Sequence, residues 1–415
     1  MTARRGLPVA LVALTVVSWV IATHWDPYPH RNLTDLPVYE DAARAITGGG
    51  VPYRDVPFEY PPLAAGLVTL ARLLPISYSA AFSLLMLTAL CATVVGAVAT
   101  ARALGLSARR QALTGGVVAL VPFLLGDFVA TRFDLAVAAL LAWTLWAAVT
   151  DRFPLAWGLV AAAVALKLVP IVLVPLLVVW HRRRRGGGAA SAPALIAGLG
   201  VAITFLPFVA LSPGGVWDMF RYHIDRPLQI ESLGSAYLLG LHGLADIGLR
   251  VDTTFGSQNL IGDGPNVIAA VSTALVIVAI AAVCATTIVL LRRIPQPGGA
   301  HLFVAAFAAT LAVSIAGGKV LSPQFLVWLL PAGLLVTGRY GRGAFAVTVC
   351  ALVTTQLYFP VRYWDLVALE HPAIALLVIR DALLVALVAL AWPRPQPAGL
   401  AVAAPSSARP VAPRH

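Results

Sequence analysis

The chain has 415 residues, of which 60% are hydrophobic and 11% are charged, and its formal net charge is +11 at pH 7. A soluble protein cannot bury that much apolar surface, because polar residues must cover its outside. The positive charge does not indicate a nucleic-acid-binding protein, since the basic residues are spread through short stretches and residues 182–185 form the only run. The three cysteines, Cys91, Cys284 and Cys350, lie in apolar segments without metal-ligand spacing, so we interpret them as packing residues.

Apolar windows of about 18 or more residues recur along the chain, and this length is needed to cross a bilayer core of about 30 Å. The period-two alternation of a membrane barrel is absent. The sequence therefore predicts an all-α, polytopic membrane protein with about twelve transmembrane helices. The expected spans cover residues 7–22, 77–101, 111–126, 134–150, 154–166, 168–181, 191–211, 264–291, 300–316, 321–338, 343–360 and 372–392.

Two of these spans leave alternatives open. Basic residues precede the first span, as in a signal peptide, but no small-x-small cleavage pattern follows it, so we favour a retained helix. Residues 154–166 and 168–181 are each short for a span. They can form either two helices or one broken element around Lys167 and Pro170.

The first long polar interruption covers residues 23–76, which we expect to form a loop with two short helices. Its acids and tyrosines are Asp35, Tyr39, Glu40, Asp41, Tyr53, Asp55, Glu59 and Tyr60. Residues 37–47 can form a helix that Asp35 caps and three glycines end. Two prolines at 61–62 can open a second helix that ends at Leu74. We expect both helices to lie along the membrane surface.

The basic residues predict the orientation of the chain. The expected cytoplasmic loops and termini hold 17 of the 29 basic residues but only one acid, Asp151. Because Lys and Arg are enriched in cytoplasmic loops, we expect both termini in the cytoplasm and the first loop outside the cell membrane. We expect one transmembrane domain over residues 1–392, a second large outer loop at 212–263, and a disordered cytoplasmic tail at 393–415.

Polar residues near the expected membrane boundaries are candidates for a site. Asp35 follows the first span, where it can either cap a helix or act as a general base toward a hydroxyl acceptor. Arg132 and Asp134 lie two residues apart, and they can either pair with each other or line a cavity. Lys167 lies between two apolar runs, where it can either reach the membrane interface or bind a phosphate.

The outer loop at 212–263 begins with a dense group of polar side chains. Its candidate binding residues are His223, Arg226, Gln229 and Glu231. An exposed loop can hold such residues by chance, but this combination suits the recognition of a sugar and a phosphate. Lys319 follows two glycines, and it either lies in a tight turn or faces an anionic headgroup. We interpret Arg380 and Asp381, inside the last span, as a structural ion pair.

Known cofactor motifs are missing from the sequence. It contains no nucleotide-binding loop, no dinucleotide-binding glycine pattern and no Cys/His metal cluster. We therefore expect no cofactor, no metal and no nucleotide-fuelled pump. A transporter or flippase of lipid-linked sugars is the main alternative to an enzyme, but many transporters have two similar halves, and no internal repeat is evident here. A non-catalytic protein of envelope assembly is a third interpretation.

Several segments resemble a known family. The motifs DxxVY at 35–39, GxPY at 50–53 and FEYPPL at 58–63 resemble the first-loop signature of the actinobacterial GT-C glycosyltransferases of family 87. Further similar segments are RxD at 132–134, KxxP at 167–170 and HxxRPxQxES at 223–232. The resemblance spans most of residues 30–335 and is most specific in the first loop.

This resemblance implies a function. The implied reaction moves a sugar, typically mannose, from a polyprenyl phosphate on the outer leaflet to a hydroxyl of a lipid-linked or cell-envelope glycan, without a metal. We hypothesise that this transfer is inverting. Asp35 matches the aspartate proposed as the base in that family. The expected partners are this donor, the glycan acceptor and membrane lipids. The substrate-binding candidates are Tyr39, Tyr53, Glu59, Tyr60, Arg132, Asp134, Lys167, His223, Arg226, Gln229, Glu231 and Lys319.

Overall fold

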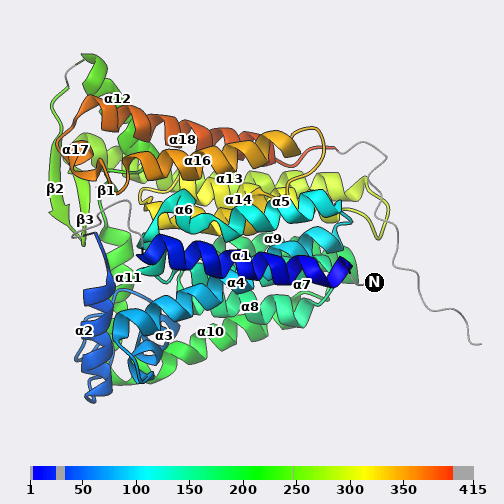
Figure 1. Cartoon of the computed structure of the whole chain (residues 1–415), viewed down its shortest axis with the longest axis horizontal. Helices are drawn as coiled ribbons and strands as arrows, with labels where there is room; N and C mark the ends of the chain where they lie inside the picture. Colours follow the sequence, from blue (N-terminus) through cyan, green and yellow to red (C-terminus); the bar gives the residue numbers. More distant parts are fainter. Residues whose placement is uncertain (1–2, 25–32, 246, 396–415) are drawn as a thin grey trace, which may run out of the picture.

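The computed structural model describes residues 3–24, 33–245 and 247–395. Helices make up nearly all the regular structure of these residues, which confirms the predicted all-α membrane protein. Figure 1 shows most helices aligned along one axis of the molecule, with short crosswise elements gathered at one end and the N-terminus at the other. The expected tail falls mostly on residues 396–415, which lie outside the described residues.

Within the described residues, five helices are long and apolar enough to cross a membrane. They are α1 (Ala3–His24), α4 (Tyr78–Ala103), α10 (Ser191–Leu211), α13 (Asp263–Arg292) and α18 (His371–Ala391). The shorter helices aligned with them include α7 (Asp134–Val149), α8 (Phe153–Leu166), α9 (Val174–Arg185), α14 (Ala300–Ala316) and α16 (Gly341–Tyr358). The chain is therefore a multi-pass membrane protein, and the predicted number of twelve spans stays a prediction.

Two expected spans are interrupted rather than continuous helices, and whether each crosses the membrane stays a prediction. Residues 111–126 divide into α5 (Ala108–Ala119) and α6 (Val121–Leu125). Pro122 lies at this junction and has no backbone N–H, so it cannot donate the hydrogen bond that would continue the helix. Residues 321–338 form the 3₁₀ helix η3 (Pro323–Leu329) and the single turn α15 (Leu330–Gly333), followed by non-helical backbone with Gly338 at a φ of 76°.

The element around Lys167 consists of two helices separated by a break. Helix α8 ends at Leu166, Lys167 is extended at φ −153°, and the 3₁₀ helix η2 (Val169–Leu173) leads into α9. Pro170 disfavours helical backbone at the residue before it and cannot donate a hydrogen bond itself. The break places the Lys167 side chain at the wall of a cavity.

Small residues allow the central helices to pack closely. A methyl group added at Gly96 of α4 would meet the Cβ of Ala142 in α7 at 3.0 Å, so the two backbones approach each other here. Helix α14 is almost entirely buried. Helix α10 has no buried residue and exposes Leu195, Ile196 and Ile203, as expected for a helix that faces lipid.

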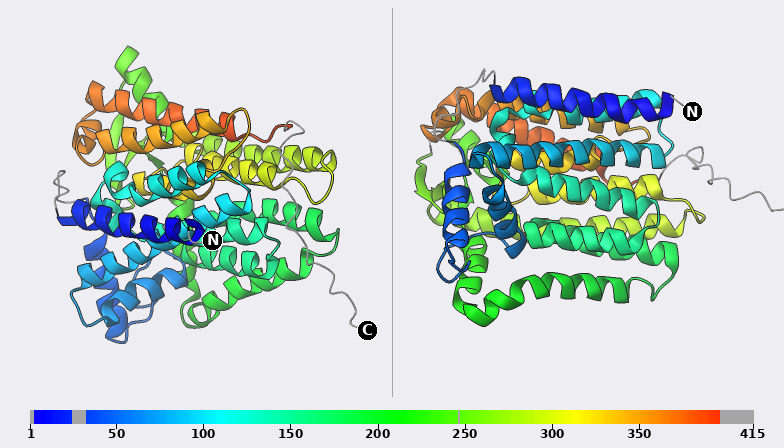
Figure 2. Two further views of the ribbon diagram at one scale, coloured as in Figure 1. Left: turned by 45° about the vertical axis from the view of Figure 1, so that its right-hand side comes forward. Right: turned by 60° about the horizontal axis from the view of Figure 1, so that its bottom comes forward.

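The crosswise end of the molecule carries the polar segments. Its elements are α2 (Leu36–Thr47), α3 (Pro62–Leu73), α11 (Pro213–Asp225), α12 (Leu233–Ala245), α17 (Tyr363–Val367), β1 (Leu228–Gln229), β2 (Arg250–Thr254) and β3 (Ser257–Ile261). The strands form an antiparallel sheet in the order β1-β3-β2, with Leu228 opposite Leu260. Residues 212–263, expected to be a loop, are therefore mostly ordered secondary structure. Figure 2 shows that α2 and α11 lie across the ends of the aligned helices.

The opposite end carries the N-terminus and the basic run after α9. Arg184 pairs with Asp151, and Arg183 donates a hydrogen bond to the carbonyl of Ile294 in the loop between α13 and α14. Gln296 returns a hydrogen bond to the carbonyl of Arg183 at 2.8 Å. These contacts hold the basic run at the end of α9 against the loop between α13 and α14, at the end of the molecule remote from α2.

Candidate active site

A cavity of about 800 Å³ lies at the crosswise end of the bundle. Helix α2, the break after α8, helix α11, the sheet and the segment before η3 all contribute to its wall. Eleven of the thirteen predicted site residues line it, although they come from segments far apart in the sequence. These are Asp35, Tyr39, Glu59, Tyr60, Arg132, Lys167, His223, Arg226, Gln229, Glu231 and Lys319.

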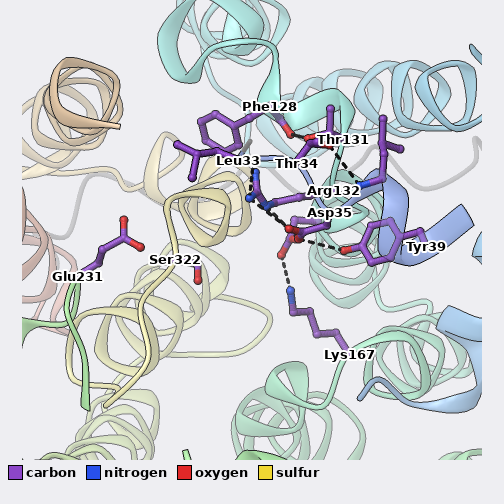
Figure 3. Close-up of polar contacts among 12 residues, drawn as sticks. Leu33, Thr34, Asp35, Tyr39, Phe128, Thr131, Arg132, Lys167, Glu231 and Ser322 are labelled. Carbon is purple, nitrogen blue, oxygen red and sulfur yellow. Dashed lines mark hydrogen bonds and ion pairs between the residues drawn. The ribbon is translucent and has the colours of Figure 1, made fainter. Parts of the chain in front are cut away.

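Asp35 forms an ion pair with Arg132 instead of capping α2. The Arg132 Nε donates to Asp35 Oδ2 at 3.1 Å, and Nη2 donates to Oδ1 at 3.3 Å and to the carbonyl of Leu33 at 2.9 Å. Asp35 occupies the N-cap position but makes no capping hydrogen bond. The Tyr39 hydroxyl approaches Asp35 Oδ2 at 3.4 Å (Figure 3). The carboxyl group is one-third exposed, so a ligand in the cavity can reach it.

The Arg132 guanidinium is held in a nearly closed environment. Its side chain is 9% exposed, and the guanidinium carbon lies 5.5 Å from the centre of the Phe128 ring and 5.8 Å from that of Phe359. Its Nη1 is buried and has no hydrogen-bond partner in the part of the chain that the structure describes. A buried guanidinium with an unused donor suits an anionic ligand.

Lys167 pairs with Asp134 across the break. Its Nζ donates to Asp134 Oδ1 at 2.8 Å, and the Asp134 side chain is only 4% exposed. The ammonium group also lies near four aromatic rings, of Tyr60, Phe133, Phe325 and Trp328, at 4.7 to 5.8 Å from their centres. Asp134 itself does not line the cavity, so its contact here is with Lys167.

Helix α11 and the residue that follows it contribute two polar side chains, His223 and Arg226, to another part of the wall. The His223 Nε2 lies 2.8 Å from the carbonyl of Glu59, and burial lowers the pKa of this histidine. Arg226 donates from Nη2 to the Ser257 hydroxyl at 3.0 Å, while its buried Nε has no partner among the described residues. Lys319 donates to the carbonyl of Ile224 at 2.6 Å, and burial lowers its pKa.

Glu231 is a second carboxyl group of the cavity, on the side away from Asp35 (Figure 3). It accepts hydrogen bonds from the Tyr358 hydroxyl at 3.0 Å and from Gln229 Nε2 at 3.1 Å. Arg380 donates to the Glu231 carbonyl, and this arginine is paired with Asp381. The ion pair predicted in the last span therefore exists and also contacts the loop that carries Glu231.

Comparison with known proteins identifies the family. A family model described as glycosyltransferase family 87 matches residues 58–323, which is more than half of the chain. The chain belongs to glycosyltransferase family 87. The matched segment contains Arg132, Lys167, His223 and Glu231, whereas Asp35 precedes it. No match was found among curated proteins.

A solved structure supports the fold of this family 87 glycosyltransferase. It is the crystal structure of ArnT from Cupriavidus metallidurans bound to undecaprenyl phosphate, with a TM-score of 0.51 and 16% sequence identity. The alignment covers 93% of this chain and 76% of the ArnT chain. At this identity the likeness establishes the GT-C fold alone.

In this glycosyltransferase two predicted site residues lie outside the cavity. Asp134 is the buried partner of Lys167, and Tyr53 lines a neighbouring cavity. Sequence reasoning missed the cavity residues Ser322, Phe359 and Tyr363. Serine and aromatic residues are common in membrane helices and loops, so nothing in the sequence around these three residues indicated a binding site. Among the described residues, no group of three His, Cys, Asp or Glu side chains is placed to hold a metal.

The contact of α11 with the turn at residues 51–56 predicts a sensitive glycine in this family 87 enzyme. Tyr53 has a φ of 68° and donates from its hydroxyl to the Tyr60 carbonyl at 2.7 Å. A methyl group at Gly215 would meet the Tyr53 carbonyl oxygen at 1.8 Å, whereas one at Gly214 would meet nothing within 4 Å. We expect Gly215→Ala to lower the thermal unfolding midpoint by several degrees and Gly214→Ala to have little effect. Equal midpoints for the two variants would contradict this packing.

The burial of Glu231 predicts that the stability of the folded protein depends on pH. Burial raises its pKa to about 7 from 4.5, against the opposing effects of Arg380 and the Tyr358 hydrogen bond. The folded protein therefore binds this proton more tightly than the unfolded chain, and the contribution to stability falls as pH rises from 4.5 to about 7. We expect the thermal unfolding midpoint of Glu231→Gln to change less between pH 5 and 7 than that of the unsubstituted protein. Parallel pH profiles would contradict an elevated pKa.

Proposed function

We propose that the enzyme transfers a sugar, with mannose as the expected one, from a polyprenyl-phosphate donor to a hydroxyl of a lipid-linked or cell-envelope glycan. The observation that carries this proposal is the presence of an accessible carboxylate, Asp35, in one cavity with Arg132, Lys167 and Arg226. Family 87 membership supports the transfer of a sugar. The ArnT structure contains undecaprenyl phosphate, which supports a lipid phosphate as the leaving group.

The proposed reaction is an inverting displacement. Asp35 accepts the proton of the acceptor hydroxyl while that oxygen forms a bond to the anomeric carbon. The bond between the anomeric carbon and the phosphate oxygen breaks, and the polyprenyl phosphate leaves with the electron pair. The arginine and lysine side chains stabilise the charge that develops on the phosphate, as preorganised donors do in other transferases.

The cavity wall also has an apolar side for the lipid. Ile171 of η2 and Val276 and Ile277 of α13 line the cavity together with the charged residues. Ile171 and Ile277 are more than half exposed in the isolated chain. We propose that the lipid of the donor contacts these residues while its phosphate reaches the basic side chains.

We propose that the cavity faces the outside of the cell membrane and that residues 1–392 act as one domain. The N-terminus and the basic run at 182–185 lie at the opposite end, where the enrichment of arginine indicates the cytoplasm. In a cysteine-free background, a cysteine introduced by Glu40→Cys should react with an impermeant maleimide in intact cells. Labelling of Glu40→Cys only after permeabilisation would reverse the orientation.

The proposed function is tested with purified protein in liposomes that contain a labelled polyprenyl-phosphate mannose. We expect label to move to a glycan acceptor and polyprenyl phosphate to be released in equal amount. Movement of the intact donor across the bilayer without cleavage would instead indicate a flippase.

A further inference from the structure

A second cavity of about 760 Å³ adjoins the first one. Its wall is formed by α2, the turn and extended segment at 53–60, and α11. The two cavities share part of their walls. The residues that line both are Val38, Tyr39, Glu59, Tyr60 and Tyr222. Because Tyr39 reaches Asp35 from this shared wall, a ligand in the second cavity would lie next to the proposed base.

The two cavities differ in charge. The first is lined by four basic side chains and three acids, which are Arg132, Lys167, Arg226 and Lys319, and Asp35, Glu59 and Glu231. The second is lined by four acidic side chains and one basic side chain. The acids are Asp41, Asp55, Glu59 and Asp218, and the base is Arg54. Arg54 is already paired with Asp55 at 2.8 Å, so no basic group of the lining is left for an anion.

Asp41 is paired with Arg44 of α2 at 3.0 Å. The other two acids, Glu59 and Asp218, are placed to accept hydrogen bonds from a ligand. Asp218 of α11 is exposed at the wall of this cavity. Glu59 lies beside the hydroxyls of Tyr60 and Tyr222. Carboxylates accept hydrogen bonds from sugar hydroxyls. Aromatic rings offer apolar surface with a polar edge, and Tyr39, Tyr53 and Phe58 add such rings to the lining. A volume in the range of small-ligand pockets fits one or a few sugar units.

We propose that the second cavity binds the acceptor and that the part of the acceptor that enters it consists of uncharged, hydroxyl-rich sugar units. This inference rests on the proposed function and extends it by assigning separate cavities to the donor and the acceptor. The acidic lining repels an anion, so a phosphate or carboxylate on the entering sugar weakens binding. The basic cavity meanwhile retains the anionic donor, and Asp35 lies where the two ligands meet.

Two model acceptors test the proposal, a neutral alkyl hexoside and the alkyl hexuronide that differs from it only by a carboxylate at the sixth carbon. Wild-type protein is expected to use the hexoside with a kcat/KM at least about tenfold higher than that for the hexuronide. Asp218→Arg is expected to raise the KM for the hexoside and to reduce this preference by about tenfold, with donor binding unchanged. Asp252→Arg is the matched control, because Asp252 is a partly exposed acid of β2 that lines neither cavity.

Calorimetric titration of both glycosides into donor-free protein separates this inference from the transfer reaction. Binding of the hexoside, weakened by Asp218→Arg but not by Asp252→Arg, supports the acceptor cavity even when no transfer occurs. Equal affinity for both glycosides, or equal effects of the two substitutions, overturns it. Transfer without any preference between the glycosides would also overturn the acceptor assignment while leaving the proposed function intact.

Discussion

The variant Asp35→Asn is expected to lower the rate of sugar transfer by about 100-fold or more, since a positioned general base typically contributes 10²–10⁴-fold. Asparagine keeps the size of the side chain and can still accept hydrogen bonds from Arg132, but it cannot accept the acceptor proton. The basic side chains of the cavity remain, so we expect the donor to bind with an affinity close to that of the wild type. Single-turnover transfer and donor binding measured on the same preparation separate the two effects.

A matched substitution on the same helix controls for damage to α2. Glu40 pairs with Arg44 on the helix surface and lines neither cavity. We expect Glu40→Gln to retain nearly full transfer, because an exposed pair of this kind contributes little. Normal transfer by Asp35→Asn would remove Asp35 from the role of base.

Replacement of Lys167 by methionine is expected to destabilise the protein strongly. Its side chain and that of Asp134 are 12% and 4% exposed, and removal of the lysine leaves the aspartate charge buried without its partner. Breaking a buried pair in this way costs about 3–5 kcal/mol. The thermal unfolding midpoint in detergent measures the loss. An unchanged midpoint would show that Lys167 does not compensate Asp134.

A second variant separates stability from function at this position. Replacing both partners, with Lys167→Met and Asp134→Leu, removes the two charges together, and such replacements are often neutral or stabilising. We expect the double variant to regain most of the unfolding midpoint but to remain deficient in transfer, because the ammonium group that faces the cavity is still missing. Full recovery of transfer would assign Lys167 a structural role only.

The sequence predicted the polar residues of the site better than their contacts. Asp35, Lys167 and Glu231 stand out because charges are costly in a largely apolar chain. Arg132 and Asp134, two residues apart, were expected either to pair with each other or to line a cavity. The structure instead pairs Arg132 with Asp35 and Asp134 with Lys167. Spacing along the chain cannot give these pairs, because they join segments that only the packing of α2, α7 and α8 brings together.

The fold was predictable for helices that are defined by the length of an apolar run alone. The long helices α4, α10, α13 and α18 follow from their hydrophobic runs. The helix breaks within 111–126 and 321–338 have a local cause, because both runs are apolar enough to span but contain prolines that interrupt the helix. The sheet was missed because its strands have two, five and five residues, too few for an alternating pattern to stand out.

A structure of the Asp35→Asn protein with a polyprenyl-phosphate sugar bound tests the proposed site most directly. We expect the phosphate to contact Arg132, Lys167 or Arg226 in the first cavity, and the anomeric carbon to face the substituted side chain and the shared wall with the second cavity. A donor bound with its phosphate away from these cations, or with residue 35 outside reach of the anomeric carbon, would contradict the proposed site.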